Sequence, residues 1–215
     1  MAVDLKKARA RMVIEQLERR GIKNARVLRA MRSIPRERFI PPELADHAYD
    51  DGPLPIGGEQ TISQPYMVAL MTEVAAPSDT EQVLEVGTGS GYQTAVLSRL
   101  SAHVFSIECD QRLHDRAAAT LAAMSINNCT LLAGDGSLGW PQAAPFDLIM
   151  VTAAMPGIPR PLLEQLRADA RLVAPVGEGE LQALVRISRA GGHWQEQYFG
   201  ECRFVKMSGQ HGFSN

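Results

Sequence analysis

Two glycines that follow an apolar run are the residues of this sequence best placed to bind a ligand. Residues Gln82–Val86 read as a short buried strand, Gly87 and Gly89 come next, and a helical pattern begins at Tyr92. Glycine lets the backbone approach a ligand where any Cβ would intrude. Glu108 ends the next expected strand about twenty residues later, where a carboxylate can accept hydrogen bonds from both ribose hydroxyls. This spacing predicts a nucleoside-cofactor site, although a purely structural turn can carry the same glycines.

The residues around the glycines distinguish among nucleoside cofactors. The glycine spacing is Gly-x-Gly-x-Gly, the acid Glu85 precedes the first glycine, and no Gly-x-x-x-x-Gly-Lys-Ser/Thr phosphate loop occurs. An acid at that position suits the ammonium of an amino acid better than a phosphate. Asp135 can accept from an adenine amino group and Gly136 can admit the ring, although Asp-Gly is also a common turn. The pattern resembles the S-adenosylmethionine methyltransferase form of the Rossmann fold.

Short apolar runs alternate with helical patterns from Gln82 onward, which predicts an α/β fold with a parallel sheet covered on both faces. Only Ala190-Gly191-Gly192 separates the last two runs, so the sheet should end in an antiparallel C-terminal hairpin. We therefore expect a Rossmann-like, doubly wound, mostly parallel sheet. The expected strands are residues 82–86, 104–108, 130–133, 147–151, 171–176, 181–188 and 195–199, and the expected helices are residues 92–100, 111–124 and 159–166.

The amino-terminal residues are helical and rich in loops. One helix should begin after Asp4 and end near Gly21, and a second should begin near Asn24 and stop before Pro35. The segment 50–58 holds too much Pro and Gly for a helix or a central strand, and its paired acids, Asp50 and Asp51, are best interpreted as turn formers. We expect one domain over 1–215, with an N-terminal helical arm that covers the substrate at 1–76 and a cofactor-binding core at 77–215.

Composition restricts the partners. The net charge of -2 gives no general attraction to nucleic acid or to an anionic membrane. Three scattered cysteines and five isolated histidines form neither a zinc motif nor a disulfide framework. We find no signal-peptide pattern and no apolar stretch long enough for a membrane span. The sequence therefore predicts a cytoplasmic protein without a metal, and the lack of heptads favours a monomer.

Motifs along almost the whole chain are similar to those of the protein-L-isoaspartate (D-aspartate) O-methyltransferase family. The most specific is the loop Gln60-Thr61-Ile62-Ser63-Gln64-Pro65, because the glycine turn is shared by many methyltransferases. The other similar stretches are Pro35-Arg36-Glu37-Arg38-Phe39, Ala48-Tyr49, Pro53-Leu54-Pro55-Ile56-Gly57, Glu85 to Tyr92, Gly134 to Trp140, Ala144 to Asp147, Val151 to Ala154, Pro175-Val176-Gly177 and Arg203-Phe204-Val205.

The resemblance implies transfer of the methyl group of S-adenosyl-L-methionine to the free carboxylate of isoaspartyl residues in damaged proteins and peptides, which initiates their repair, with S-adenosyl-L-homocysteine as the product. It implies Ser63 as the active-site hydroxyl. The cofactor contacts that it implies are Gln60, Thr61 and Ile62 in the covering loop, Glu85, Gly87 and Gly89 for the methionine part, Glu108 for the ribose, Asp135 and Gly136 for the adenine, and Gln182 nearby.

The chain departs from the family pattern at three places. Glu59 stands where a second glycine is frequent, so the shape of the loop can differ. Arg167-Ala168-Asp169-Ala170 replaces a usual Pro-Gly-Gly turn, which we expect to alter only a link between a helix and a strand. Lys206 stands where proline is common.

Two interpretations of Ser63 remain open. A carboxylate, whose pKa is ordinarily about 4, is already ionised at neutral pH and needs no general base, so a serine that orients it is sufficient. From spacing alone, Ser63 reads better as the N-cap of a helix over 64–74, and the two roles are compatible. The alternative functions are a small-molecule or nucleic-acid methyltransferase on the same scaffold and a cofactor-binding protein without catalysis.

Overall fold

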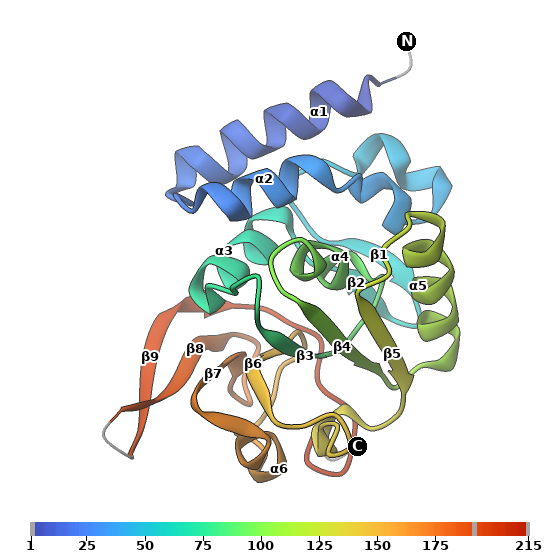
Figure 1. Ribbon diagram of the computed structural model, residues 1–215. Helices are drawn as coiled ribbons and strands as arrows, with labels where there is room; N and C mark the ends of the chain where they lie inside the picture. Colours follow the sequence, from blue (N-terminus) through green and yellow to red (C-terminus); the bar gives the residue numbers. More distant parts are fainter. Residues whose placement is uncertain (1–2, 191–192, 214–215) are drawn as a thin grey trace.

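A seven-stranded sheet in the order β5-β4-β3-β6-β7-β8-β9 forms the centre of the protein. We describe the fold from a computed structural model that covers residues 3–190 and 193–213. Figure 1 shows α1 and α2 stacked beyond α3 and α4, and α6 at the other side of the sheet. The expected Rossmann-like α/β architecture, with a mostly parallel sheet and an N-terminal helical arm, is confirmed.

Five strands form the parallel part of the sheet. Their pairs β3–β4, β3–β6, β4–β5 and β6–β7 are all parallel. Leu84 and Val86 pack on one face, with Leu162 of α6, while Val83 packs on the other with Met71 of α3. Burial on both faces explains the nearly continuous apolar runs. The bounds are β3 (Gln82–Val86), β4 (His103–Glu108), β5 (Cys129–Ala133), β6 (Phe146–Val151) and β7 (Leu166–Val176).

The carboxyl-terminal edge of the sheet is antiparallel. β8 (Gln182–Ala190) runs against β7, and β9 (His193–Cys202) runs against β8. The expected hairpin is therefore present, although Gly191 and Gly192 in its link lie outside the described residues. One expectation was wrong: Arg167 and its three neighbours lie inside β7 rather than in a link. The register between β6 and β7 shifts there, and Arg167 Nη1 donates to Asp147 Oδ1 at 2.6 Å.

The helices between the parallel strands are close to those expected: α4 (Tyr92–Ser98), α5 (Gln111–Ala123) and α6 (Arg160–Glu164). Asp110 caps α5 by accepting a hydrogen bond from the backbone N–H of Arg112 at 2.8 Å. No helix in the described part of the chain is both long and apolar enough to cross a bilayer.

The arm begins as expected at its N-cap Asp4, with α1 (Leu5–Met12) continuing through the π-helix η1 (Val13–Leu17) and the 3-10 turn η2 (Glu18–Arg20). Gly21 ends the helix with a φ of 96°, and Asn24 caps α2 (Ala25–Ser33). The short 3-10 turns η3 (Arg36–Phe39) and η4 (Pro42–His47) lead on to the next segment. The arm shares one apolar cluster with α3, α4 and α5, so it packs on the helices rather than on the sheet.

The Pro- and Gly-rich segment forms a two-stranded hairpin, β1 (Leu54–Gly57) with β2 (Gln60–Ile62), followed by α3 (Pro65–Ala75). The structure corrects the expectation that Ser63 caps this helix, because Gln64 is the N-cap and makes no side-chain cap bond. The first helical residue is Pro65, which lacks an N–H and has its backbone angle already set. Ser63 is therefore free of the capping role.

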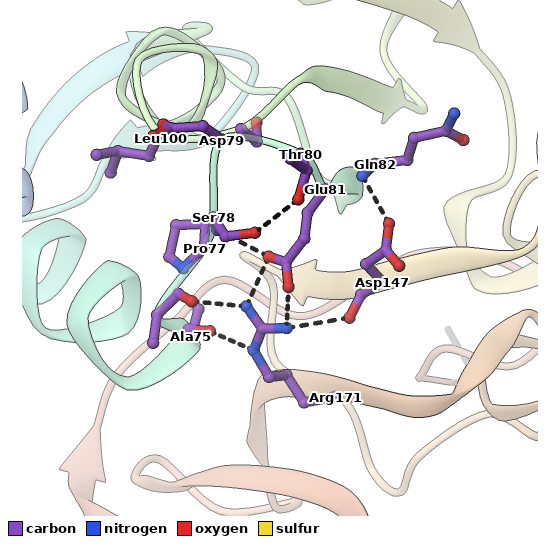
Figure 2. A network of polar contacts seen from close by, with 12 residues as sticks. Ala75, Pro77, Ser78, Asp79, Thr80, Glu81, Gln82, Leu100, Asp147 and Arg171 are labelled. Atoms are coloured by element: carbon purple, nitrogen blue, oxygen red, sulfur yellow. Dashed lines mark hydrogen bonds and ion pairs between the residues drawn. The ribbon is translucent and has the colours of Figure 1, made fainter.

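An arginine on β7 ties the end of α3 to the amino ends of β3 and β6 (Figure 2). Arg171 donates to both carboxylate oxygens of Glu81, each at 2.8 Å, and to the carbonyl of Asp147 at 3.2 Å. It also donates to the terminal carbonyls of α3, those of Ala75 and Ala76. Carbonyls at a helix end have no partner within the helix, so the guanidinium supplies one.

Candidate active site

A cleft lies at the carboxyl ends of β3, β4 and β6. Arg171 and its partners lie at the other, amino ends of β3 and β6. The loop from Gln60 to Ser63, the glycine turn and the segment from Phe204 to Ser208 all contribute to the lining of the cleft. The predicted site residues that line the cleft are Gln60, Thr61, Ile62, Ser63, Gly87, Gly89, Glu108 and Gly136. The structure thus brings together residues that are far apart in sequence, while Glu85, Asp135 and Gln182 lie outside the lining.

The glycine turn depends on the absence of side chains. Gly87 has a φ of 97°, and a Cβ built on it would lie 2.5 Å from Oγ1 of Thr152. The Thr152 hydroxyl donates to the carbonyl of Gly87 at 2.6 Å, and the N–H of Gly87 donates to the carbonyl of Ile107 at 2.8 Å. Only glycine fits both the backbone angle and this contact. The turn is therefore held open as a backbone surface that a ligand can approach.

Glu108 presents a preorganised carboxylate at the tip of β4. Its Oε2 accepts from the N–H of Gly89 at 2.7 Å, and its Oε1 accepts from the N–H of Asp110 at 3.0 Å. The residue lines the cleft although it is mostly buried. A fixed acceptor with spare lone pairs in this place suits a vicinal diol such as a ribose.

Glu85, which we expect to hold the methionine part of a cofactor, does not line the cleft in this structure. Its side chain is 0% exposed and lies beneath the turn, where Oε2 accepts from Ser106 at 2.6 Å and from Thr94. Burial raises its pKa to about 7, against the lowering effect of those two hydroxyls. Glu85 therefore supports the strand and the helix that flank the turn. Its Oε1 is buried without a hydrogen-bond partner among the described residues, and its contact with the cofactor stays a prediction.

Asp135, which we expect to accept from the adenine amino group, has protein partners in this structure, so that role stays a prediction. It accepts from the Ser137 N–H at 2.9 Å, from the Ser137 hydroxyl at 2.6 Å and from the Gln210 N–H at 2.7 Å, so its side chain faces the C-terminal segment. Burial acts to raise its pKa, but these hydrogen bonds outweigh burial and lower it. Gly136 does line the cleft, and a Cβ there would lie 2.5 Å from Val86. The close packing of Gly136 on β3 is thus sufficient to explain why this position lacks a side chain.

Gln182 positions a cleft residue instead of lining the cleft. Its Nε2 donates to the carbonyl of Gly179 at 2.8 Å, and its Oε1 accepts from the N–H of Phe204 at 2.9 Å. Phe204 is in the wall. Gln182 therefore reaches the cleft only through Phe204.

Sequence reasoning missed several lining residues. Thr88, Ser90 and Gln93 follow from the glycine motif by adjacency, and Thr152 follows from its place just after β6. In the C-terminal wall (residues 204–208), only the family resemblance at Arg203-Phe204-Val205 gave a sequence signal. This wall is held by long-range backbone bonds, from the Ala154 N–H to Val205 and from the Met207 N–H to Ala154, both at 2.8 Å.

Within residues 3–190 and 193–213, no group of three or more His, Cys, Asp or Glu side chains is arranged to hold a metal ion. The cleft itself has a single acid, Glu108, and a single base, Lys206. Its chemistry therefore comes from backbone groups, hydroxyls and apolar walls.

The sequence matches the family described as protein-L-isoaspartate (D-aspartate) O-methyltransferase over residues 8–212. The chain belongs to this family. A protein-L-isoaspartate O-methyltransferase from Methylorubrum extorquens is 51% identical to it, over 95% of this chain and 90% of its own length. One from Syntrophus aciditrophicus is 48% identical, over 97% of both chains.

Solved structures agree with this membership. One protein-L-isoaspartate O-methyltransferase superposes with a TM-score of 0.84 at 28% identity, covering 95% of this chain and 67% of its own. A Plasmodium falciparum protein described as a beta-aspartate methyltransferase, in complex with S-adenosyl-L-homocysteine, gives a TM-score of 0.82 at 23% identity and covers 96% of this chain and 99% of its own. The second likeness supports the fold. The motif-based resemblance is thereby confirmed.

Proposed function

We propose that this chain transfers the methyl group of S-adenosyl-L-methionine to the free carboxylate of isoaspartyl residues in damaged proteins and peptides. Family membership over nearly the whole chain supports the activity. The observation that carries the assignment to this cleft is that Ser63, the Gly87 turn and Glu108 line the same hollow. The turn would hold the amino acid part of the cofactor, and Glu108 its ribose.

The fit of the cofactor rests on the Gly87 turn, whose backbone lines the cleft without a side chain, and on the acceptor oxygens of Glu108. The cofactor supplies an electrophilic methyl group on a cationic sulfur. The chain needs no general base, because an isoaspartyl carboxylate is ionised at neutral pH. A carboxylate oxygen forms the new bond to the methyl carbon while the carbon–sulfur bond breaks, and no proton moves. The chain must therefore align two reactants, which well-oriented sites do with effective molarities worth about 7 kcal/mol or more.

Ser63 would orient the acceptor. It follows β2 directly, caps no helix, and its hydroxyl makes no hydrogen bond to any other residue within the described part of the chain. A hydroxyl so placed can donate to one oxygen of a carboxylate and direct the other toward the methyl group. The apolar lining residues Val68, Met71 and Phe204 would exclude water around the pair.

Substitution of Ser63 tests the catalytic role. We expect Ser63→Ala to lower kcat/KM for an isoaspartyl peptide by at least about tenfold, since one lost hydrogen bond to a charged group is worth about 1.5–3 kcal/mol. Ser33→Ala, in α2 of the arm, is the matched control and should leave kcat/KM unchanged. A loss of no more than about twofold in Ser63→Ala would remove Ser63 from the mechanism.

A labelled-methyl assay with paired peptides tests the function. An isoaspartyl peptide should gain a base-labile label, and its aspartyl twin should not. Equal labelling of both peptides, or labelling of RNA or small acceptors alone, would refute the assignment in favour of another methyltransferase. Retention of the cofactor without any transfer would indicate a binding protein.

We also propose that the chain acts as a cytoplasmic monomer without nucleic-acid partners. The thiols of Cys109, Cys129 and Cys202 are all free, in keeping with a reducing compartment. Sedimentation equilibrium at micromolar concentration should give the mass of one chain, and a dimer mass would contradict the proposal.

A further inference from the structure

The two charged residues of the cleft lining differ in their protein partners. These residues are Glu108 and Lys206. Glu108 directs both oxygens onto backbone N–H groups, those of Gly89 and Asp110. Lys206 makes no ion pair within 4 Å to any carboxylate of the described residues. The cation therefore has no carboxylate partner, whereas the acid is held in place by two backbone N–H groups.

Lys206 is fixed at the base of its side chain and exposed at its end. Its backbone forms a bridge to Ala154, and its neighbours Val205 and Met207 bond to that same residue. The ammonium lies 4.9 Å from the ring centroid of Phe213, within the range of a cation–π contact. The residue as a whole remains exposed. The wall thus carries a positive charge at a defined place without neutralising it.

We propose that Lys206 is a specificity-determining residue that draws the acceptor carboxylate into the cleft. This inference rests on the proposed function, in which the acceptor is an anion. Lys206 lines the cleft although it is exposed, and a cation in the wall of a cleft with apolar residues attracts an incoming carboxylate more strongly than a cation on a flat surface. Methylation converts that carboxylate to a neutral ester, so the attraction to Lys206 is lost in the product. The same residue therefore favours substrate entry and product release.

Steady-state kinetics on three variants tests the proposal. In buffer of about 0.01 M ionic strength, where the screening length is about 30 Å, Lys206→Met should raise KM for an isoaspartyl peptide about fivefold. At about 1.4 kcal/mol per tenfold, that change corresponds to about 1 kcal/mol. The kcat and the cofactor KM should stay within about twofold. Lys206→Arg should restore KM, and Lys206→Glu should raise it further.

Salt and a matched control separate a field effect from a structural one. At about 1 M salt the screening length falls to about 3 Å, and the KM values of wild type and Lys206→Met should converge. Lys23→Met changes the net charge equally at an exposed position outside the cleft lining and should leave KM unchanged. The fold of each variant is checked by its thermal unfolding.

The inference would be overturned by a KM for Lys206→Met within about 1.5-fold of wild type at low salt, by an increase that persists at high salt, or by an equal increase in Lys23→Met. An increase confined to peptides with acidic neighbours around the isoaspartyl site would also refute it, because the acceptor carboxylate would then not be the recognised group. Absence of isoaspartyl methylation by the wild type would instead refute the proposed function, so the two failures are distinguishable.

Discussion

Replacing Arg171 by Met should destabilise the protein without altering the cleft. The side chain of Arg171 is 9% exposed and that of its partner Glu81 is 19% exposed. In Figure 2 the guanidinium reaches both the carboxylate and the carbonyls at the end of α3, so methionine would leave several acceptors unpaired at once. Removing one member of a buried pair costs about 3–5 kcal/mol. Because Glu81 is partly hydrated, we expect a loss of about 3 kcal/mol, at the low end of that range.

Urea and thermal unfolding measure this loss. In chains of about 150–250 residues, 1 kcal/mol shifts Tm by about 2–4 °C, so Arg171→Met should lower Tm by about 6–12 °C. Arg171→Lys keeps the positive charge but lacks the planar guanidinium group, so its loss in unfolding free energy should be about half that of Arg171→Met. Adding Glu81→Gln to Arg171→Met should recover about 1–2 kcal/mol, because the orphaned carboxylate is then gone. The cofactor KM should not change, since the network lies at the amino ends of β3 and β6.

Arg160→Met is the matched control for Arg171→Met. Arg160 pairs with Glu164 at 2.6 Å, but the two side chains are 87% and 58% exposed. Its removal should change the unfolding free energy by less than about 0.5 kcal/mol. If Arg171→Met costs no more than this control, the interpretation of the network as a stabilising clamp is refuted.

Two further predictions concern the glycine turn. Gly87→Ala should lower cofactor affinity at least about tenfold by calorimetry, because a positive φ and the contact with Thr152 both exclude a Cβ; unchanged affinity would contradict the geometry. For Glu85, the folded pKa of about 7 lies above the ordinary value of 4.5. The protonated carboxyl group therefore contributes to the free energy of unfolding fully below pH 4.5, and this contribution is lost as the pH rises through 7. Glu85→Gln should therefore gain stability relative to wild type between these pH values, by roughly 3 kcal/mol in unfolding experiments, and a constant difference would refute the burial argument.

The sequence was sufficient to predict the helices and strands whose buried side chains form a periodic or continuous pattern of apolar residues. The predicted bounds of β3 match those observed, because a parallel strand covered on both faces must be apolar throughout. The caps at Asp4 and Asn24 were likewise local signals. The hairpin of β1 and β2 could not be predicted in the same way, since its strands have four and three residues and too few side chains to show alternation.

The candidate site was predictable where adjacency in sequence means adjacency in space. Glu85 and Glu108 look alike as acids at strand ends, yet Glu85 lies one residue inside β3 and faces Thr94 of α4, whereas Glu108 is the last residue of β4 and reaches the cleft. The side-chain alternation of a strand accounts for that difference only once the covering helix is placed. The interaction of Asp135 with Gln210, by contrast, is a long-range contact that no local pattern specifies.

The wall from Phe204 to Ser208 has a consequence for the order of assembly. All five of its residues come after β9, which ends at Cys202, so the cleft cannot close until nearly the entire described chain has been synthesised. A ribosome-bound chain lacking these residues has the glycine turn but not the enclosure. We therefore expect tight cofactor retention to appear only once residues 204–208 have been synthesised.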